Sequence, residues 1–397
     1  MSKGKADSLH IGIYGRRNVG KSTLINAITQ QEVAIVSSVA GTTTDPVKRS
    51  FELLGIGPVV FIDTAGIDDT NELGEQRINK TLGTIQQIDI AILVITSPQQ
   101  TLEKEEQRLI DSFNHLNTPY LIVYNQRDEK KQILSISDPL IVLNAKTGEG
   151  IANLLSKLVK IARPLQQKTP LLGDIIKARD IILLITPVDS EAPEGRLILP
   201  QVNTIRDIID NNAVAIVMKE NEVEHFLSTS GVKPALAITD SQLFKKAGQL
   251  IPNDIPLTSF SILLARQKGN FDAFIKGTPS ISSLKDGDRI LMLESCSHQT
   301  SCEDIGRVKI PSWLQAFTSK KLLFDTVSRL DNICRPITAY ALVIQCGGCM
   351  VTRKQLTNRL QPFIDAGIPV TNYGMSIAYT QGIFDRATQP FMNTKVE

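Results

Sequence analysis

Residues 15–22 read Gly-Arg-Arg-Asn-Val-Gly-Lys-Ser, a complete G-x-x-x-x-G-K-S phosphate-binding loop. The apolar run Leu9–Tyr14 before it is typical of a β-strand, and a helix is expected to begin at Gly20. In such a loop the glycines let backbone N–H groups face the phosphate oxygens, Lys21 neutralises the outer phosphates, and the Ser22 hydroxyl is placed to ligate magnesium. The positive end of the helix adds to this attraction. A chance glycine turn is the competing interpretation, and the strand and helix context argues against it.

Two further segments predict the magnesium side of a nucleotide site. Residues 63–66 read Asp-Thr-Ala-Gly after a predicted strand, so Asp63 is expected to hold the metal through water and the Gly66 amide to sense the γ-phosphate. Between this segment and the phosphate loop, residues 41–45 read Gly-Thr-Thr-Thr-Asp, a candidate first switch in which Thr43 completes the magnesium shell. The expected catalytic groups are Lys21, Thr43, Asp63 and Gly66.

Two loops later in the chain predict which base is bound. Residues 125–128 read Asn-Gln-Arg-Asp and residues 144–146 read Asn-Ala-Lys, and they resemble the Asn-Lys-x-Asp guanine reader and the Ser-Ala-Lys loop of small GTPases. A carboxylate at Asp128 accepts two hydrogen bonds from the guanine edge that adenine cannot supply, which favours GTP over ATP. Gln126 replaces the usual lysine and Asn144 the usual serine, so modest affinity is expected. The expected contacts to GTP or GDP are Gly15, Asn18, Val19, Gly20, Lys21, Ser22, Thr23, Thr43, Asp63, Gly66, Asn125, Asp128, Ala145 and Lys146.

The phosphate loop and the Gly-Thr-Thr switch resemble those of the TrmE and Era group of small GTPases. In those relatives the asparagine that matches Asn18 helps to bind potassium, whose charge lies near the transferring phosphate. The resemblance therefore implies K⁺ at Asn18, beside Mg²⁺ on Ser22 and Thr43, while a simple loop-forming role for Asn18 stays open. Ile67 stands where Ras-type GTPases have a water-orienting glutamine, so slow intrinsic turnover is expected.

The composition excludes several classes of protein. With 42% hydrophobic and 21% charged residues the chain is globular rather than disordered. Its formal charge of +2, from 43 basic and 41 acidic residues, gives no sign of a concentrated basic face, so nucleic acid is not an expected partner. Met1–Lys5 lacks the apolar segment of a signal peptide, and apolar runs such as Ile88–Ile95 are too short to cross a bilayer. A cytoplasmic protein without a membrane partner is expected.

At 397 residues the chain is long enough for two or three domains. Apolar and amphipathic runs alternate up to about Ala162, which predicts an α/β P-loop GTPase fold with a mainly parallel sheet and helices on both faces. Residues 163–170 carry the two prolines and polar spacing of a linker. No internal repeat is visible. We predict a GTPase domain over 1–168, a small α/β domain for packing or self-association over 169–262, and a third α/β domain over 263–397.

All the cysteines lie in the last third of the chain: Cys296, Cys302, Cys334, Cys346 and Cys349. Five is an odd number, and a disulfide framework would not be distributed in this way. One predicted strand runs into the C-x-H sequence of residues 296–298, and another runs into the C-x-x-C sequence of residues 346–349. Spacing alone leaves three interpretations open: a zinc knuckle, a three-cysteine iron-sulfur cluster, or buried reduced thiols.

A GTPase domain of this group, a small α/β domain and a C-terminal C-x-H plus C-x-x-C set together resemble the HydF family of [FeFe]-hydrogenase maturation GTPases. The resemblance implies a 4Fe-4S cluster on Cys296, Cys346 and Cys349. It also implies a scaffold that carries the two-iron subcluster, made with radical maturation enzymes, to apo-[FeFe]-hydrogenase. A homodimer or higher homo-oligomer would form through the middle domain. Cys302 and Cys334 match no motif of that family and are interpreted as ordinary thiols.

One residue departs from the family pattern. Many members have a histidine before the C-x-x-C pair, whereas this chain has Gln345. The candidates for the fourth iron position are therefore His298, Glu294, Glu303, Asp304 or solvent. An exchangeable position would suit a scaffold, because an incoming precursor could bind there. A second class of function stays open, a zinc-binding GTPase that acts on RNA or ribosomes.

Overall fold

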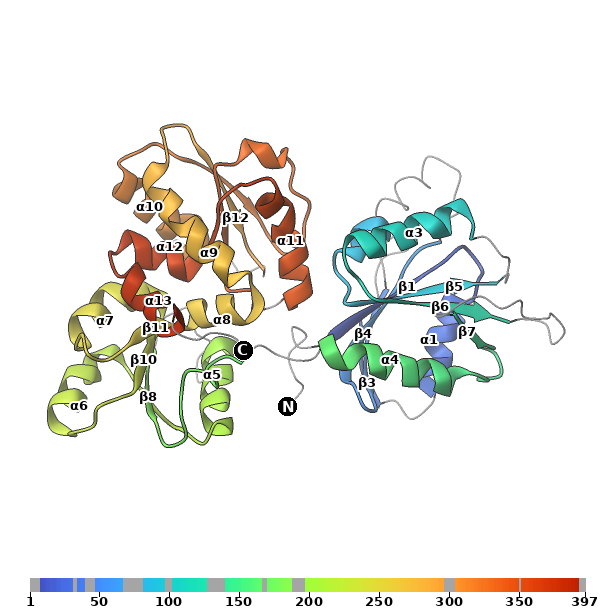
Figure 1. Ribbon diagram of the computed structural model, residues 1–397, viewed down its shortest axis with the longest axis horizontal. Helices are drawn as coiled ribbons and strands as arrows, with labels where there is room; N and C mark the ends of the chain where they lie inside the picture. Colours follow the sequence, from blue (N-terminus) through green and yellow to red (C-terminus); the bar gives the residue numbers. More distant parts are fainter. Residues whose placement is uncertain are drawn as a thin grey trace. The chain divides into compact units, whose positions relative to one another are not determined.

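The computed structural model describes residues 8–30, 34–39, 47–66, 81–96, 102–126, 140–165, 170–187, 197–295, 304–349 and 351–392. The chain forms two compact units, Met1–Lys168 and Thr169–Glu397 (Figure 1). No helix within these described ranges is long and apolar enough to cross a bilayer.

The first unit is built on one seven-stranded sheet with the order β2-β3-β4-β1-β5-β6-β7. Strand β3 pairs antiparallel with β4 and with the edge strand β2, and every other pair is parallel. The strands are β1 (Leu9–Tyr14), β2 (Ala34–Val39), β3 (Val47–Leu53), β4 (Gly57–Asp63), β5 (Ile90–Ile95), β6 (Tyr120–Asn125) and β7 (Leu140–Leu143). The sequence predicts strands at residues 9–14, 49–54, 59–63, 90–96, 120–125 and 140–144, and every strand of this sheet except β2 overlaps one of these ranges.

Helices cover both faces of this sheet. The helices α1 (Lys21–Gln30) and α4 (Ile151–Leu165) pack on one face, and α3 (Lys104–His115) packs on the other (Figure 1). Alternate residues of β1 supply the two cores, because Ile13 packs with the first pair of helices and Tyr14 with α3. The predicted α/β fold, with a mainly parallel sheet between two helical layers, is confirmed for this unit.

The second unit contains two four-stranded parallel sheets, with the orders β11-β10-β8-β9 and β13-β12-β14-β15. The strands are β8 (Ile181–Ile185), β9 (Val214–Met218), β10 (Leu236–Thr239), β11 (Leu257–Ser259), β12 (Arg289–Leu293), β13 (Leu323–Val327), β14 (Leu342–Gln345) and β15 (Val370–Asn372). The α-helices are α5 (Leu199–Asp210), α6 (Val223–Thr229), α7 (Phe244–Leu250), α8 (Phe260–Lys268), α9 (Phe271–Gly277), α10 (Ile310–Thr318), α11 (Arg353–Asp365), α12 (Tyr373–Thr380) and α13 (Phe384–Met392).

These two sheets repeat one topology. In each, the first strand along the chain is central, the second lies on one side of it, and the third and fourth lie on the other. The turn into the first strand is repeated as well, because Asp180 Oδ2 accepts from the Lys177 amide and Asp288 Oδ2 accepts from the Lys285 amide, both at 2.7 Å. The expectation of no internal repeat is therefore wrong.

The repeat extends to the last strand of each sheet. Ser259 ends β11 and caps α8 by accepting from an amide at 3.3 Å, and Asn372 ends β15 and caps α12 in the same way at 2.8 Å.

The chain reverses its winding direction between the first and third strands of each sheet. In open α/β sheets, ligands bind outside the carboxyl ends of such strands, which in the second sheet are β12 and β14.

One hydrophobic core joins the two sheets of the second unit. Ile182 and Ile238 of one sheet belong to the same cluster of buried side chains as Ile290 and Ile344 of the other. The helix α8 contacts α5, α11 and α12 and so touches elements of both halves. The division of this unit at residues 262–263 stays a prediction.

Candidate functional site

The phosphate loop connects β1 to α1, and its conformation requires glycine at two positions. Gly15 has a φ of +142°, and a Cβ there would lie 2.4 Å from the Val94 carbonyl oxygen. Gly20 has a φ of +96°, and a Cβ there would lie 2.3 Å from Asn125 Nδ2. Any side chain at either position would force the loop away from β5 or from Asn125.

The Lys21 ammonium lies inside the curve of this loop. Its side chain is buried, and Nζ donates to the carbonyl oxygens of Gly15 at 2.9 Å and Arg16 at 2.8 Å. Two carbonyl oxygens of the loop thus face the ammonium. The geometry therefore holds one positive charge where the loop closes.

A hydroxyl and a carboxylate meet beside the loop. Ser22 Oγ donates to Asp63 Oδ2 at 2.7 Å, which brings the start of α1 to the end of β4. The next residue, Thr64, donates its hydroxyl to the Ile13 carbonyl at 2.7 Å and fixes this segment against β1. Oxygen donors of these kinds are the ligands that Mg²⁺ prefers. Gly66 follows at the end of the described segment, and Thr43 lies outside the described residues.

Asn125 joins the phosphate loop to the loop after β7. Its Nδ2 donates to the Val19 carbonyl at 2.9 Å, and its Oδ1 accepts from the Ala145 amide at 3.0 Å. Asn144 takes the place of a serine by accepting from the amides of Lys146 and Thr147 at 2.9 and 3.2 Å, as asparagine side chains do in turns. Asp128 lies outside the described residues, so the base contact expected from it stays a prediction.

Asn18 lies at the exposed outer side of the loop with a φ of +59°. Asparagine adopts this left-handed conformation more readily than most residues. The conformation agrees with a loop-forming role and leaves the carboxamide at the surface, so the potassium role of Asn18 stays a prediction. Thr23, the third residue of α1, is exposed as well.

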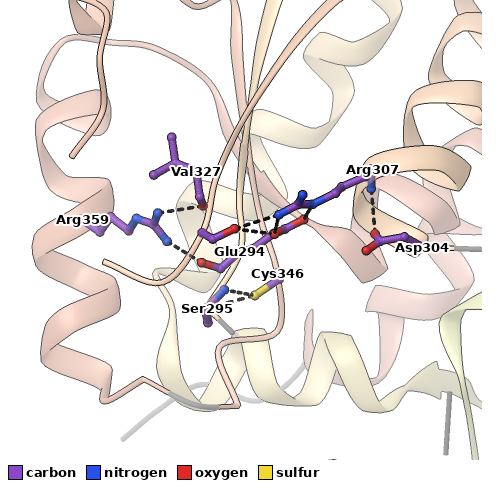
Figure 2. Close-up of polar contacts among 8 residues, drawn as sticks. Glu294, Ser295, Asp304, Arg307, Val327, Cys346 and Arg359 are labelled. Atoms are coloured by element: carbon purple, nitrogen blue, oxygen red, sulfur yellow. Dashed lines mark hydrogen bonds and ion pairs between the residues drawn. The ribbon is translucent and has the colours of Figure 1, made fainter. Parts of the chain in front are cut away.

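In the second unit the strands that lead to the two cysteine motifs are neighbours. Strand β12 pairs with β14 so that Leu293 lies beside Gln345. Just beyond this pair, the Ser295 amide donates to Cys346 Sγ at 3.1 Å, and the Cys346 thiol lies 3.1 Å from Ser295 Oγ, to which it donates (Figure 2). Ser295 and Cys346 thus lie side by side where the chain leaves β12 and β14.

Several candidate ligands lie outside the described residues: Cys296, His298 and Glu303, together with the additional thiol Cys302. Within the described part of the chain, no group of three or more His, Cys, Asp or Glu side chains is placed to hold a metal ion. The three-cysteine set is therefore a proposal. Cys334, the other thiol without a motif, is exposed and unbridged.

The C-x-x-C turn is held from two sides. Gln345, at the position of the family's histidine, is buried and donates its amide to Ser295 Oγ at 3.1 Å and to Cys346 Sγ at 3.5 Å. The ammonium of Lys268, at the end of α8, donates to the carbonyls of Gly348 and Val351 at 3.1 Å each. Burial raises the pKa of the Cys346 thiol. A buried cation beside the turn is the type of group that stabilises thiolates.

The two described carboxylates among the fourth-ligand candidates have other partners. Glu294 accepts from Arg307 through Oε1 at 3.0 Å and Oε2 at 2.8 Å (Figure 2). It also accepts from the Ser328 hydroxyl at 2.9 Å. Asp304 Oδ1 accepts from the Arg307 amide at 2.9 Å and caps the short π-helical segment Ile305–Lys309. The Glu294 carboxylate raises the pKa of Arg307. Either carboxylate would have to give up these contacts to bind iron.

Sequence reasoning missed four residues of this site: Ser295, Arg307, Lys268 and Arg359. The last of these donates from α11 to the carbonyls of Glu294 and Val327, at 3.0 Å each. None of them belongs to a recognisable motif. The sequence does place Ser295 directly before Cys296. Its contact with Cys346 could not be predicted, because it depends on the pairing of β12 and β14.

The first unit has many relatives among known GTPases. Residues 10–126 match the family model described as 50S ribosome-binding GTPase. The tRNA modification GTPase MnmE of Nitrosomonas europaea is 37% identical over 161 residues, which cover 39% of this chain and 35% of that protein. MnmE of Prochlorococcus marinus is 38% identical over 162 residues, which cover 38% and 34%. The chain thus spans about a third of the length of these curated relatives.

Two solved structures match part of this chain. The G domain of the T. maritima iron transporter FeoB is 21% identical with a TM-score of 0.29, and the match covers 39% of this chain and 99% of that one. Aquifex aeolicus Era bound to GDP and AlF4⁻ is 18% identical with a TM-score of 0.33, and the match covers 53% and 92%.

The seven-stranded fold, the phosphate loop and the GTPase family match define the first unit as a P-loop GTPase domain. The second unit matches the hydrogen maturase F dimerization domain over residues 171–269 and the hydrogen maturase F tetramerization domain over residues 272–390. Together these two models match more than half of the chain. It belongs to the hydrogen maturase F family, the group that the sequence resembles, and its second unit is an oligomerisation module.

Proposed function

We propose that this protein is a GTP-hydrolysing scaffold that assembles or delivers the two-iron subcluster of [FeFe]-hydrogenase and carries a 4Fe-4S cluster on Cys296, Cys346 and Cys349. One observation carries the proposal: the Ser295 amide lies 3.1 Å from Cys346 Sγ. Because Cys296 is the next residue in the chain, all three thiols belong to two loops that start from one point of the sheet. Membership in the hydrogen maturase F family supports the link to hydrogenase maturation.

The residues around Cys346 suit an anionic cluster. Donors from the Ser295 amide and from Gln345 reach its sulfur, and hydrogen bonds of this kind stabilise the thiolates that hold iron-sulfur clusters. Lys268 adds a positive charge at the C-x-x-C turn. When bound, a cluster with three cysteine ligands supplies an iron whose fourth position can accept an exchangeable ligand.

The nucleotide site would act as the control element. In this proposal Lys21 neutralises the outer phosphates, Ser22 and Thr43 ligate Mg²⁺ with Asp63 acting through water, and Gly66 senses the γ-phosphate. Hydrolysis would release the segments that the γ-phosphate orders and so alter contacts with partners. Those partners are the radical maturation enzymes and apo-[FeFe]-hydrogenase.

Metal analysis of the anaerobically reconstituted full chain tests the cluster. We expect iron and sulfide in near-equal amounts, loss of both in C346S and C349S, and retention in C334S, whose thiol is exposed and outside the site. Zinc without iron would reject the proposal and favour the zinc-binding GTPase that acts on RNA or ribosomes. That alternative also predicts that RNA stimulates GTP turnover.

A further inference from the structure

We infer that Arg359 is a positioning residue for the cluster. Its guanidinium holds and polarises the peptide group between Glu294 and Ser295, so that the N–H of this peptide is directed at Cys346 Sγ. This inference rests on the proposed cluster-binding function and concerns the same site. It assigns a role to a side chain that belongs to no motif and that, among the described residues, donates to backbone carbonyls rather than to a thiol.

The geometry is a chain of two hydrogen bonds through one planar peptide. Arg359 Nη1 donates to the Glu294 carbonyl oxygen at 3.0 Å. The C=O of Glu294 and the N–H of Ser295 belong to the same peptide group, and that N–H donates to Cys346 Sγ at 3.1 Å (Figure 2). The guanidinium and the sulfur therefore bind opposite ends of one dipole.

A second contact fixes the position of the guanidinium. Arg359 Nη2 donates to the Val327 carbonyl at 3.0 Å, and the same carbonyl accepts from the Glu294 amide at 2.9 Å. The guanidinium thus spans the ends of β12 and β13. Arg307 differs, because it binds the side-chain carboxylate of Glu294 and leaves the peptide group to Arg359.

The charge of Arg359 strengthens the donor that it holds. Hydrogen bonds in series polarise one another, most strongly away from bulk water, so a cation on the carbonyl oxygen makes the attached N–H a better donor. Among the described residues Arg359 makes no ion pair, and although burial lowers its pKa to about 10, it remains charged at neutral pH. A stronger N–H···S bond and a nearby positive charge both favour the reduced, more negative cluster.

The reduction potential of the reconstituted full chain tests this role. R359Q removes the charge and keeps an amide donor, whereas R359K keeps the charge and loses the two-pronged geometry. We expect the midpoint potential, from a titration followed by electron paramagnetic resonance, to be highest in the wild type, lower in R359K and lowest in R359Q. The matched control is K320Q, which removes an exposed cation at the opposite end of the sheet and is expected to leave the potential unchanged.

A wild-type potential in R359Q, or an equal shift in K320Q, would overturn the inference. If R359Q binds no iron, R359K carries the test, and a potential at or above the wild-type value refutes the role. These results are distinct from a failure of the proposed function, in which the wild-type chain itself holds no iron and sulfide.

Discussion

Asn18 combines two properties that point to different roles. Its φ of +59° suits a residue that shapes the phosphate loop, and its exposed carboxamide suits a potassium ligand. Glycine adopts a positive φ without strain but has no side-chain oxygen. The substitution of Asn18 by glycine therefore separates the two roles.

We expect N18G to bind GTP and to lose the stimulation of hydrolysis by potassium, with a fall of about tenfold in rate, or about 1.4 kcal/mol in barrier. Phosphate release in potassium and in sodium buffers measures this. The control is N117G, which replaces another asparagine of positive φ, at +47°, after α3. Full potassium stimulation in N18G would leave Asn18 with the loop-forming role only.

Strand β9 is an edge strand that presents apolar side chains to solvent. Val214 is 50% exposed and Val217 is 42% exposed. On the helix α5, which contacts β9, Val202 and Ile209 are exposed as well. Exposed apolar edges are normally covered, since they would otherwise pair with other chains. In a unit that matches a dimerization domain, we expect this edge to lie between two copies of the chain.

V217K places a charge on this edge and should weaken self-association. Burial of a valine side chain contributes about 1.5–3 kcal/mol, so the dissociation constant is expected to rise at least tenfold. Sedimentation velocity over a concentration series measures the change. L54K, which alters a highly exposed leucine of the first unit, should leave association as it is. An unchanged V217K assembly would place the interface elsewhere.

The second unit is held together along its whole length. Besides the core that its sheets share, its last helix, α13, contacts β11 of the first sheet. Arg386 on that helix is half-buried and donates to four carbonyls around the end of α7, those of Gly248, Ile251, Pro252 and Ile255. Neither half of this unit buries its apolar surface without the other.

Fragments test this dependence. Residues 169–397 are expected to unfold in one cooperative transition, whereas residues 263–397 should show no cooperative transition, because the core side chains that face the first sheet would be exposed. Circular dichroism during thermal unfolding distinguishes the two. A cooperative transition in the shorter fragment would establish it as a separate domain.

Within the full chain, R386M should destabilise the second unit. Hydrogen bonds to charged groups contribute about 1.5–3 kcal/mol each, and some of the freed carbonyls would regain water, so a net loss of about 2–4 kcal/mol is expected. Calorimetry would show a lower Tm for that unit. R206M, at an exposed arginine of α5, should leave the Tm within about a degree. Equal effects from both variants would contradict the docking role of Arg386.

Short stretches of sequence were sufficient to predict many elements of this protein. The phosphate loop is recognisable because its glycines, lysine and serine act within eight consecutive residues. Strands β1 and β6 have their predicted ends, since their apolar runs stop at polar loop residues. The sequence Ala-Leu-x-Ile occurs at residues 235–238 and again at 341–344. A match of four residues is too short to predict that two sheets share one topology.

Short patterns of neighbouring residues were therefore sufficient to predict the nucleotide site, the two cysteine motifs and the alternation of strands and helices. The pairing of β12 with β14, the core shared by two sheets, and the approach of Arg359 to the 294–295 peptide depend on contacts between residues tens of positions apart. Such contacts are selected by the burial of apolar surface over a whole unit, which no short window of sequence contains. For this reason the cysteine motifs by themselves indicate the proposed iron site, whereas the residues around Cys346 are identified only in the folded chain.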